Sequence, residues 1–389
     1  MIDQVEHPGR DKFSPAKRLG AIMASYMLRH EDFYLFSPDE TTSNKLDATF
    51  EVSARAWALP EESWDLPEAR NGRIIEMLSE NTLFACMVGH LMNGEPAAMT
   101  SYESFFTIIA SQVMQHIKFL QQSAEVAWRG DIPAANLLST STCWRQDHNG
   151  FTHQSPALIS LLLSNPSDRA NCLFPIDDVA AEAAFIYMMN SQNVVNLTTF
   201  NKTDQPRWID SHQADSMFHD GGAAILDFAS DEAPDYIFTG AGDIVSCEAL
   251  AAIEILREDI PAKHFRFVNI SALSYNAIGT TDRKLTQDEF DQLFTKNKPI
   301  IANFHGYPDA LHGILAKYAD PKRLNVHGFL EHGSTTTPFE MLSLNRASRY
   351  HLALDVAQLE KRDDLIKKYQ KILRDNSAYA REHGVDQIA

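Results

Sequence analysis

Short apolar segments alternate with segments of helical periodicity through most of this chain. The apolar segments predict strands at residues 136–143, 169–175, 194–200, 236–239, 265–270 and 300–304. Helical spacing predicts helices at residues 157–163, 179–189, 247–256, 287–294 and 310–318. Strands that alternate with helices are joined by right-handed crossovers into mostly parallel sheets, so the pattern predicts an α/β fold.

Two further segments bear on the domain organisation. Residues 102–128 have helical spacing over their whole length and predict one long helix. Residues 206–220 are polar and irregular, and Gly221 and Gly222 follow them, which is typical of a linker. We therefore expect two independent α/β domains, residues 1–210 and residues 211–389.

A dense polar segment, residues 146–154, lies between a predicted strand and a predicted helix. It contains two histidines, His148 and His153, with Gln146, Asp147 and Asn149. Ligand sites of α/β proteins lie at the carboxyl ends of strands, and buried polar groups are costly unless they are paired. The segment is thus a candidate site, although a loop with an Asn-Gly turn and a helix cap would also explain it.

Composition narrows the class of protein. The chain has 389 residues, of which 44% are hydrophobic and 22% charged, as in ordinary globular proteins. No apolar run approaches the about 18 residues that span a bilayer, and the N-terminal residues lack the pattern of a secretion signal, so we expect a cytoplasmic protein without a membrane partner. The net charge of −18 argues against nucleic acid as a partner, but a few cations in one cleft can still bind an anionic substrate.

The cysteines are widely spaced and form no Cys-x-x-Cys pair. We expect free, buried thiols rather than disulfides or a zinc site. These residues are Cys86, Cys143, Cys172 and Cys247.

Several ordered blocks resemble one enzyme family. Residues 144–154 (WRQDHNGFTHQ) resemble the WRQDHNGFSHQ signature of phosphoketolases, which are thiamine-diphosphate enzymes that cleave ketose phosphates. The resemblance runs from about residue 18 to the C-terminus. Its other blocks are residues 37–44 (SPDETTSN), 72–80 (GRIIEMLSE), 101–105 (SYESF), 305–308 (HGYP) and 333–339 (GSTTTPF).

The resemblance implies two transketolase-like domains, each with three α/β/α layers. Residues 1–210 would be the pyrimidine-binding domain, and residues 211–389 would be the C-terminal domain of phosphoketolases. The diphosphate-binding domain of the family has no counterpart here. A second subunit is therefore expected to carry the thiamine-diphosphate and Mg²⁺ ligands, in an α2β2 or larger assembly, and this chain is expected to hold no metal ligand.

The resemblance assigns Glu80 as a catalytic and cofactor-binding residue. In such enzymes a glutamate hydrogen-bonds the aminopyrimidine ring and promotes the tautomer that activates the thiazolium carbon. This role requires a buried, protonated carboxyl group, so we expect the site to raise the pKa of Glu80. A surface glutamate on a helix is the alternative for Glu80, as it is for Glu76.

The 146–154 segment would line the substrate channel if the resemblance holds. A histidine can accept the sugar hydroxyl proton near neutral pH, and we favour His153 over His148 for this role. Gln146 and Asn149 would hold hydroxyl groups or an enolate oxygen. One of the two histidines could instead be a structural hydrogen-bonding group.

Phosphate binding would involve Ser43, Lys45, Tyr102 and Lys202, with Tyr102 also near the cofactor. Here the chain departs from the family. Lys45 replaces an arginine, so a point charge stands in place of a two-point clamp. Asn81 replaces a histidine beside Glu80. These departures put the usual sugar substrates in doubt.

Two other groups resemble metal sites but are interpreted differently. Residues 240–244 with Asn269 mimic the Gly-Asp-Gly and Asn ligands of magnesium, yet Ile244 replaces the third glycine and Asn269 falls in a predicted strand. The histidines at 305–312 and 327–332 lack a paired helical carboxylate and are expected to be structural.

The function expected from the resemblance is that of one subunit of a split phosphoketolase-like lyase of carbohydrate metabolism. It would cleave the C2–C3 bond of a ketose phosphate and yield an acetyl adduct that phosphate captures as acetyl phosphate. The first alternative is transketolase-like two-carbon transfer to another acceptor. The second is a non-catalytic subunit that stabilises a partner.

Overall fold

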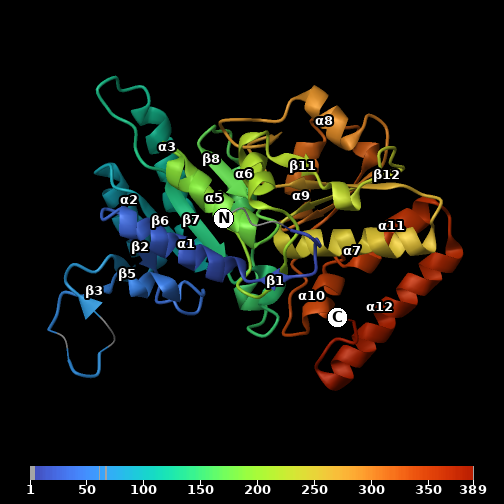
Figure 1. Cartoon of the computed structure of the whole chain (residues 1–389), viewed down its shortest axis with the longest axis horizontal. Coiled ribbons are helices and arrows are strands. Elements are labelled where there is room, and N and C mark those ends of the chain that lie inside the picture. The colour runs from blue at the N-terminus through green and yellow to red at the C-terminus, as the bar shows by residue number, and fades with distance from the viewer. Residues whose placement is uncertain (1–4, 61, 66–67, 389) are drawn as a thin grey trace. The chain divides into compact units, whose positions relative to one another are not determined.

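The computed structural model describes residues 5–60, 62–65 and 68–388 (Figure 1). The chain forms two compact units. The first comprises residues 1–141 and 165–215, and the second comprises residues 142–164 and 216–389. The 146–154 segment is thus grouped with the later part of the chain.

The sheet of the first unit is parallel and runs in the order β8-β9-β7-β6-β2-β5-β3-β4. In its register Tyr102 lies opposite Thr140, and Ser139 lies opposite Thr199, so the carboxyl ends of three strands meet at one edge. A small antiparallel pair, β1-β10, accompanies the sheet. The strands are β1 (Lys12–Phe13), β2 (Tyr34–Ser37), β3 (Arg55–Ala56), β4 (Glu68–Ala69), β5 (Ile74–Glu76), β6 (Ala97–Tyr102), β7 (Ala135–Thr140), β8 (Ala170–Leu173), β9 (Val195–Thr199) and β10 (Gln205–Pro206).

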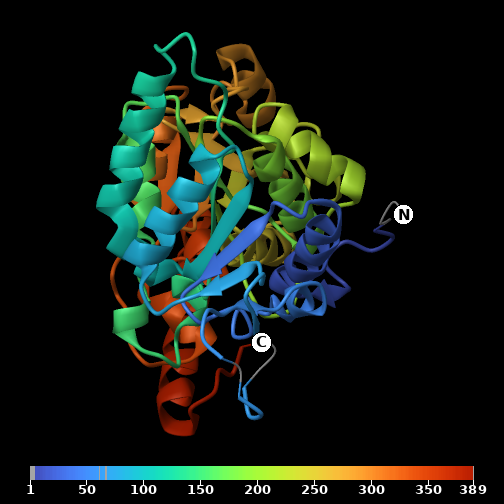
Figure 2. The ribbon, with the colours of Figure 1, turned by 90° about the vertical axis from the view of Figure 1, so that its left-hand side faces the viewer.

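Helices cover both faces of this sheet. Figure 2 shows α2 and α3 on one side of the strands and α1 with α5 on the other, which makes three layers. Helix α1 begins at Pro15, with Ser14 as its N-cap, and buries the apolar face that includes Leu19, Met23 and Met27. The helices are α1 (Pro15–Arg29), α2 (Glu80–Met92), α3 (Ala110–Ser123) and α5 (Asp178–Asn190), with 3₁₀ turns at Asp47–Glu51 and Glu103–Ile109.

Asp177 anchors the start of α5 to a distant part of the first unit. Its side chain is fully buried and accepts the Ala180 N–H at 2.9 Å as the N-cap of α5. The other carboxylate oxygen accepts the Trp208 and Ile209 N–H groups at 2.8 and 3.1 Å. One carboxylate therefore accepts backbone hydrogen bonds from two segments, the start of α5 and residues 208–209.

The sheet of the second unit runs in the order β11-β13-β12-β16-β17. Its strands are parallel except β11, which is antiparallel to β13. Strands β12 and β16 are buried throughout, as expected for parallel strands covered on both faces. The strands of this unit are β11 (Ala223–Ile225), β12 (Tyr236–Ala241), β13 (Phe265–Ile270), β14 (Ala272–Ser274), β15 (Ala277–Ile278), β16 (Ile300–Phe304) and β17 (Leu324–His327).

Helices α7 and α11 pack on one face of this second sheet and α9 on the other (Figure 1). Helix α8 begins with a capping box formed by Thr286 and Glu289. The helices are α4 (Ala157–Ser164), α7 (Asp243–Asp259), α8 (Gln287–Phe294), α9 (Pro308–Leu315), α10 (Pro338–Leu344), α11 (Arg349–Leu359) and α12 (Asp363–His383), with α6 (Ser211–His219) at the boundary between the units and 3₁₀ turns at Cys143–Arg145, Phe151–His153, Asp227–Ala229 and Pro321–Arg323.

The predicted alternation of strands and helices is confirmed, and three local predictions are wrong. Residues 102–128 do not form one helix, because Tyr102 ends β6 and the α-helix covers only Ala110–Ser123. The expected linker contains α6, because Asp210 and Gln213 exchange side-chain to backbone hydrogen bonds at its start. Cys86 is exposed on α2, whereas Cys143 and Cys172 are buried and form no disulfide.

Within the described ranges, no helix combines the length and the apolar character that crossing a bilayer requires.

Candidate functional site

Three of the expected phosphate-binding residues lie together at the carboxyl edge of the first sheet. Tyr102 is the last residue of β6, and its hydroxyl donates to Ser43 Oγ at 3.2 Å. The Lys202 ammonium lies 4.8 Å from the centre of the Tyr102 ring, as a cation–π pair. The group therefore presents one positive charge and two hydroxyl groups, which are suitable donors for a phosphate.

Glu40 is a member of this group that the sequence analysis missed. It follows β2, and its carboxylate accepts the Tyr102 N–H at 3.0 Å while its own N–H donates to Ser37 Oγ at 3.1 Å. Burial, and to a smaller extent the charge of Glu80, raise the pKa of Glu40 to about 7 against the opposing effects of the Tyr102 N–H, Asn44 and Lys202. The signal in the sequence was Asp39-Glu40 directly after a strand.

Glu80 is the first residue of α2, and Ser79 caps that helix. Its side chain is half-buried in this chain rather than buried, which differs from the expectation. The exposed side chains of Met77 and Leu78 precede it. Glu80 is thus a half-buried carboxyl group with an apolar border, and its charge acts on the nearby Glu40.

Lys45 and Asn81, the two positions expected to depart from the resembled family, lie in different surroundings. Lys45 is exposed, and its backbone lies in the left-handed region at φ 64°. The Asn81 amide donates to Ile108 O at 3.3 Å and to Gln112 Oε1 at 3.2 Å, so it is held by α3 and the turn before it. Asn81 thus contributes to the packing of the first unit.

Titration of Glu40 provides a direct test of this geometry. We expect a midpoint near the pKa of about 7, measured by carbon NMR of labelled carboxyl groups. Glu80→Gln should lower that midpoint, because it removes a negative charge that raises the pKa. Since the pKa is raised from 4.5, the protonated group stabilises the fold at low pH, and that contribution is lost as the pH rises through about 7.

The control for this titration is Glu51→Gln, at an exposed position of the same unit. It should leave the Glu40 midpoint unchanged. A Glu40 midpoint near 4.5, or one that does not respond to Glu80→Gln, would contradict the arrangement.

The 146–154 segment belongs to the second unit and forms a hydrogen-bonded loop. Gln146 is buried, and its side-chain oxygen accepts the Asn149 amide at 2.5 Å while its carbonyl accepts the Gln154 amide at 2.9 Å. His148 and Asn149 are exposed. His153 is half-buried and contacts Thr152 Oγ1 through Nδ1 at 2.9 Å.

Residues 333–337 pack directly against this loop, although they are far away in the sequence. The Thr336 N–H donates to Asp147 O, and Gln154 donates to Ser334 O, both at 3.0 Å. A Cβ atom on Gly333 would lie 2.0 Å from Gln154 Oε1 and 2.2 Å from Phe151 Cδ2. The glycine is therefore required by the close approach of the two segments.

Gly333→Ala should consequently disturb the 146–154 loop. We expect a loss of about 1–3 kcal/mol in the free energy of unfolding, as for overpacked sites, with faster amide exchange of residues 150–154. Gly313→Ala is the matched control, because a Cβ atom there meets nothing within 4 Å. Equal stability of both variants would show that the two segments are not tightly packed.

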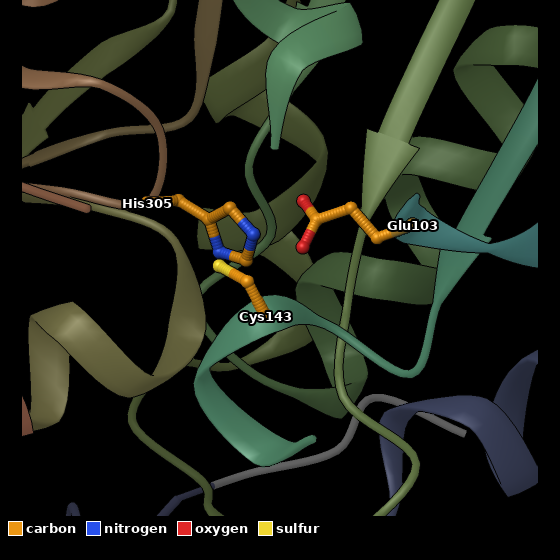
Figure 3. A group of neighbouring side chains, drawn as sticks. All are labelled: Glu103, Cys143 and His305. Carbon is orange, nitrogen blue, oxygen red and sulfur yellow. The ribbon is translucent and has the colours of Figure 1, made fainter. Parts of the chain in front are cut away.

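Cys143 and His305 form a buried pair in the second unit. Figure 3 draws the His305 ring beside the Cys143 thiol, and the sulfur lies within 4.8 Å of a ring nitrogen. The His305 carbonyl accepts the Trp144 indole N–H at 2.9 Å. Glu103, also drawn in Figure 3, belongs to the first unit. The pair connects the residues before the 146–154 loop to the end of β16.

The structure thus collects the expected site residues into two groups, one in each unit. Glu80, Ser43, Tyr102 and Lys202 belong to the first group, together with Glu40. Gln146, His148, Asn149 and His153 belong to the second group. Acid–base groups, hydroxyl donors and a cation of this kind can bind and deprotonate a hydroxylated anion.

The fold is that of transketolases. A transketolase from Pichia stipitis matches with a TM-score of 0.69 and 14% identity, over 92% of this chain and 47% of that chain. A transketolase from Campylobacter jejuni matches with a TM-score of 0.64, over 92% of this chain and 48% of that chain. A structure described as a split gene transketolase, inactive beta4 tetramer, matches with a TM-score of 0.59 over 90% of this chain and 98% of that chain.

The sequence comparisons define the family within that fold. Residues 17–191 match the D-xylulose 5-phosphate/D-fructose 6-phosphate phosphoketolase family, and residues 202–389 match its C-terminal domain. The chain belongs to the phosphoketolase family. It is 35% identical to a probable phosphoketolase of Pseudomonas putida over 97% of this chain and 49% of the relative, and 37% identical to one of Rhodopseudomonas palustris over 97% and 50%. The chain spans about half the length of these curated relatives.

Proposed function

We propose that this chain is one subunit of a split, thiamine-diphosphate-dependent phosphoketolase-like enzyme. The observation that carries the proposal is the group of Glu40, Glu80, Tyr102 and Lys202 at the carboxyl edge of the first sheet. This group combines two neighbouring carboxyl groups with a cation and hydroxyl groups. A cation and hydroxyl groups can bind the phosphate of a sugar phosphate, and a carboxyl group can hydrogen-bond a cofactor ring.

Each residue of the first group has a distinct task in this proposal. Lys202 offers its charge to the phosphate of the substrate, and the hydroxyl groups of Ser43 and Tyr102 donate to it. Glu80 would hydrogen-bond the aminopyrimidine ring, and its charge acts on the neighbouring Glu40. Thiamine diphosphate would supply the nucleophilic carbon that opens the C2–C3 bond of a ketose phosphate.

The second group would act on the sugar hydroxyl groups. The half-buried His153 accepts a hydroxyl proton, because histidine is the side chain that most often acts as a general base. Gln146 and Asn149 orient the oxygen atoms, and the hydrogen bond between their amides sets the positions of both side chains. His148 is exposed and is proposed as a second histidine of the same site.

A partner subunit would supply the diphosphate and Mg²⁺ ligands. This is supported by the likeness to a chain described as a split gene transketolase, of which 98% is covered. We propose an α2β2 or larger assembly. Its obligate interface would bury more than about 2,000 Å².

Transketolase-like transfer of a two-carbon unit is the second candidate. Asn81 stands where the family has a histidine, and its amide is occupied by Ile108 and Gln112. The reaction product distinguishes the two: acetyl phosphate supports the lyase, and a ketose phosphate two carbons longer than the aldose acceptor supports transfer.

The proposal is tested by reconstitution. The isolated chain should be inactive and should bind thiamine diphosphate weakly in calorimetric titration with Mg²⁺, because the diphosphate carries most of the cofactor's charge. Co-expression with a subunit that has a Gly-Asp-Gly and Asn motif should give an active heteromer by native mass measurement. Submicromolar cofactor binding by an active homodimer of this chain would refute the split arrangement.

A further inference from the structure

A pocket of about 650 Å³ opens in the second unit, on residues that have no part in the function proposed above. This volume suits a small-molecule ligand. A loop with four successive hydroxyl side chains forms one wall, and the end of α12 forms another. The lining includes Ser334, Thr335, Thr336, Thr337, Glu340 and Arg381.

Glu340 gives this pocket an unused hydrogen-bond acceptor. The residue is 5% exposed, and its Oε1 accepts the Ser377 hydroxyl at 2.8 Å. Its Oε2 is buried and has no hydrogen-bond partner. A buried carboxylate oxygen without a donor is costly, so a ligand that brings a hydroxyl group would be stabilised there.

His332 adds a second acceptor at the rim. Its Nδ1 lies 3.0 Å from the Leu344 carbonyl, which can only accept a hydrogen bond. Nδ1 is therefore the donor of that hydrogen bond, and Nε2 is the ring nitrogen that can contact a ligand hydroxyl group. Two acceptors in one pocket favour a ligand with several hydroxyl groups.

Arg381 adds a positive charge at the surface of this pocket. Its side chain is 77% exposed, and its guanidinium lies 3.9 Å from Glu340 Oε1. Arg374 lines an adjoining pocket of about 440 Å³ that shares Glu340 and Arg381. In a chain with a net charge of −18, two arginines here make a local anion-binding position. Glu340 would repel an anion placed against it, so the anionic end belongs on the solvent-facing side of the Arg381 guanidinium, away from Glu340.

The walls of the pocket are held in place without a ligand. The Asp386 carboxylate accepts the Thr337 hydroxyl at 2.5 Å and the Phe339 N–H at 2.8 Å. The buried side chain of Asn376 donates to the same carboxylate at 3.2 Å. A site that is already organised loses little entropy when a ligand binds.

We propose that this pocket binds a phosphorylated polyol. The phosphate lies on Arg381 and the hydroxyl side chains of the 334–336 loop, and the hydroxyl groups of the ligand donate to Glu340 and His332. The Thr336 N–H donates to Asp147 O, and Gln154 donates to Ser334 O, so an occupied pocket stabilises the 146–154 loop. The pocket is thus an effector site linked to that loop.

Calorimetric titration of the full chain with D-glucitol 6-phosphate tests the proposal, because this polyol has no ketone to react. Inorganic phosphate and D-glucitol, titrated separately, should each bind at least about 10-fold more weakly. Inorganic phosphate lacks the hydroxyl groups that contact Glu340 and His332, and D-glucitol lacks the phosphate that contacts Arg381. Arg381→Ala should weaken the phosphorylated polyol by about 10-fold or more, and exposure of the side chain makes misfolding of this variant unexpected. Glu340→Gln should weaken the phosphorylated polyol more than inorganic phosphate.

Two controls separate this site from the site of the proposed function. Lys371→Ala removes an exposed cation of the same helix, and Lys202→Ala removes the cation of the first unit. Both should keep wild-type affinity, and ligand should slow amide exchange at Thr336. Binding that survives Arg381→Ala but is lost in Lys202→Ala, equal affinity for inorganic phosphate, or no binding at all would each overturn the proposal.

Discussion

Glu80→Gln is expected to lower the turnover of the reconstituted enzyme by about 10²-fold or more, the scale of a lost proton-transfer group. Glutamine keeps the shape of the side chain at the start of α2 but cannot exchange a proton. The stability of the chain should change little, because Glu80 is half-buried and is not the N-cap of that helix.

Steady-state kinetics and thermal unfolding of the same variant make the comparison. Glu125→Gln, at an exposed position of the first unit, is the control and should retain full turnover. Near-wild-type turnover of Glu80→Gln would make Glu80 a surface residue of α2, and the proposed proton transfer would then require another acid. Loss of stability without a specific loss of turnover would assign it a structural role.

Asp177→Ala should lower the free energy of unfolding of the first unit by about 3 kcal/mol. The estimate combines a lost N-cap with two buried N–H groups left without an acceptor. Three donors, on Ala180, Trp208 and Ile209, depend on this one carboxylate. Trp208 fluorescence during urea unfolding reports on the affected segment directly.

Asp204→Ala is the matched control, because Asp204 is exposed in the segment before β10. Its stability should stay within about 0.5 kcal/mol of wild type. Asp177→Asn keeps one acceptor oxygen, so its free energy of unfolding should lie between those of Asp177→Ala and Asp204→Ala. A loss below 1 kcal/mol for Asp177→Ala would mean that water replaces the carboxylate at these donors.

The strands and helices that sequence periodicity predicted best are buried and regular. Strand β13 (Phe265–Ile270), strand β16 (Ile300–Phe304) and helix α8 (Gln287–Phe294) have the predicted bounds. Both strands lie inside the sheet and are mostly apolar, because neighbouring strands flank them and helices cover the sheet. Helix α8 carries its own start signal in the Thr286 capping box.

The predictions that failed depended on contacts with distant residues. Tyr102 has a helix-compatible pattern around it, but pairing with Thr140 places it in a strand. Pro206 begins the expected linker, but it and the preceding Gln205 pair with Lys12 and Phe13. In both cases a backbone hydrogen bond to a remote strand outweighs the local propensity, which is worth only tenths of a kcal/mol per residue.

The sequence by itself determined the α/β alternation, the family and the chemical types of the candidate residues, because periodicity and short ordered blocks are local properties. Only the tertiary structure decided that Glu40 joins Tyr102, Glu80 and Lys202, and that Gly333 lies against Gln154. Strand register and chain crossover bring these residues together, and burial then sets the pKa of Glu40. Neither effect is encoded in the spacing of residues along the chain.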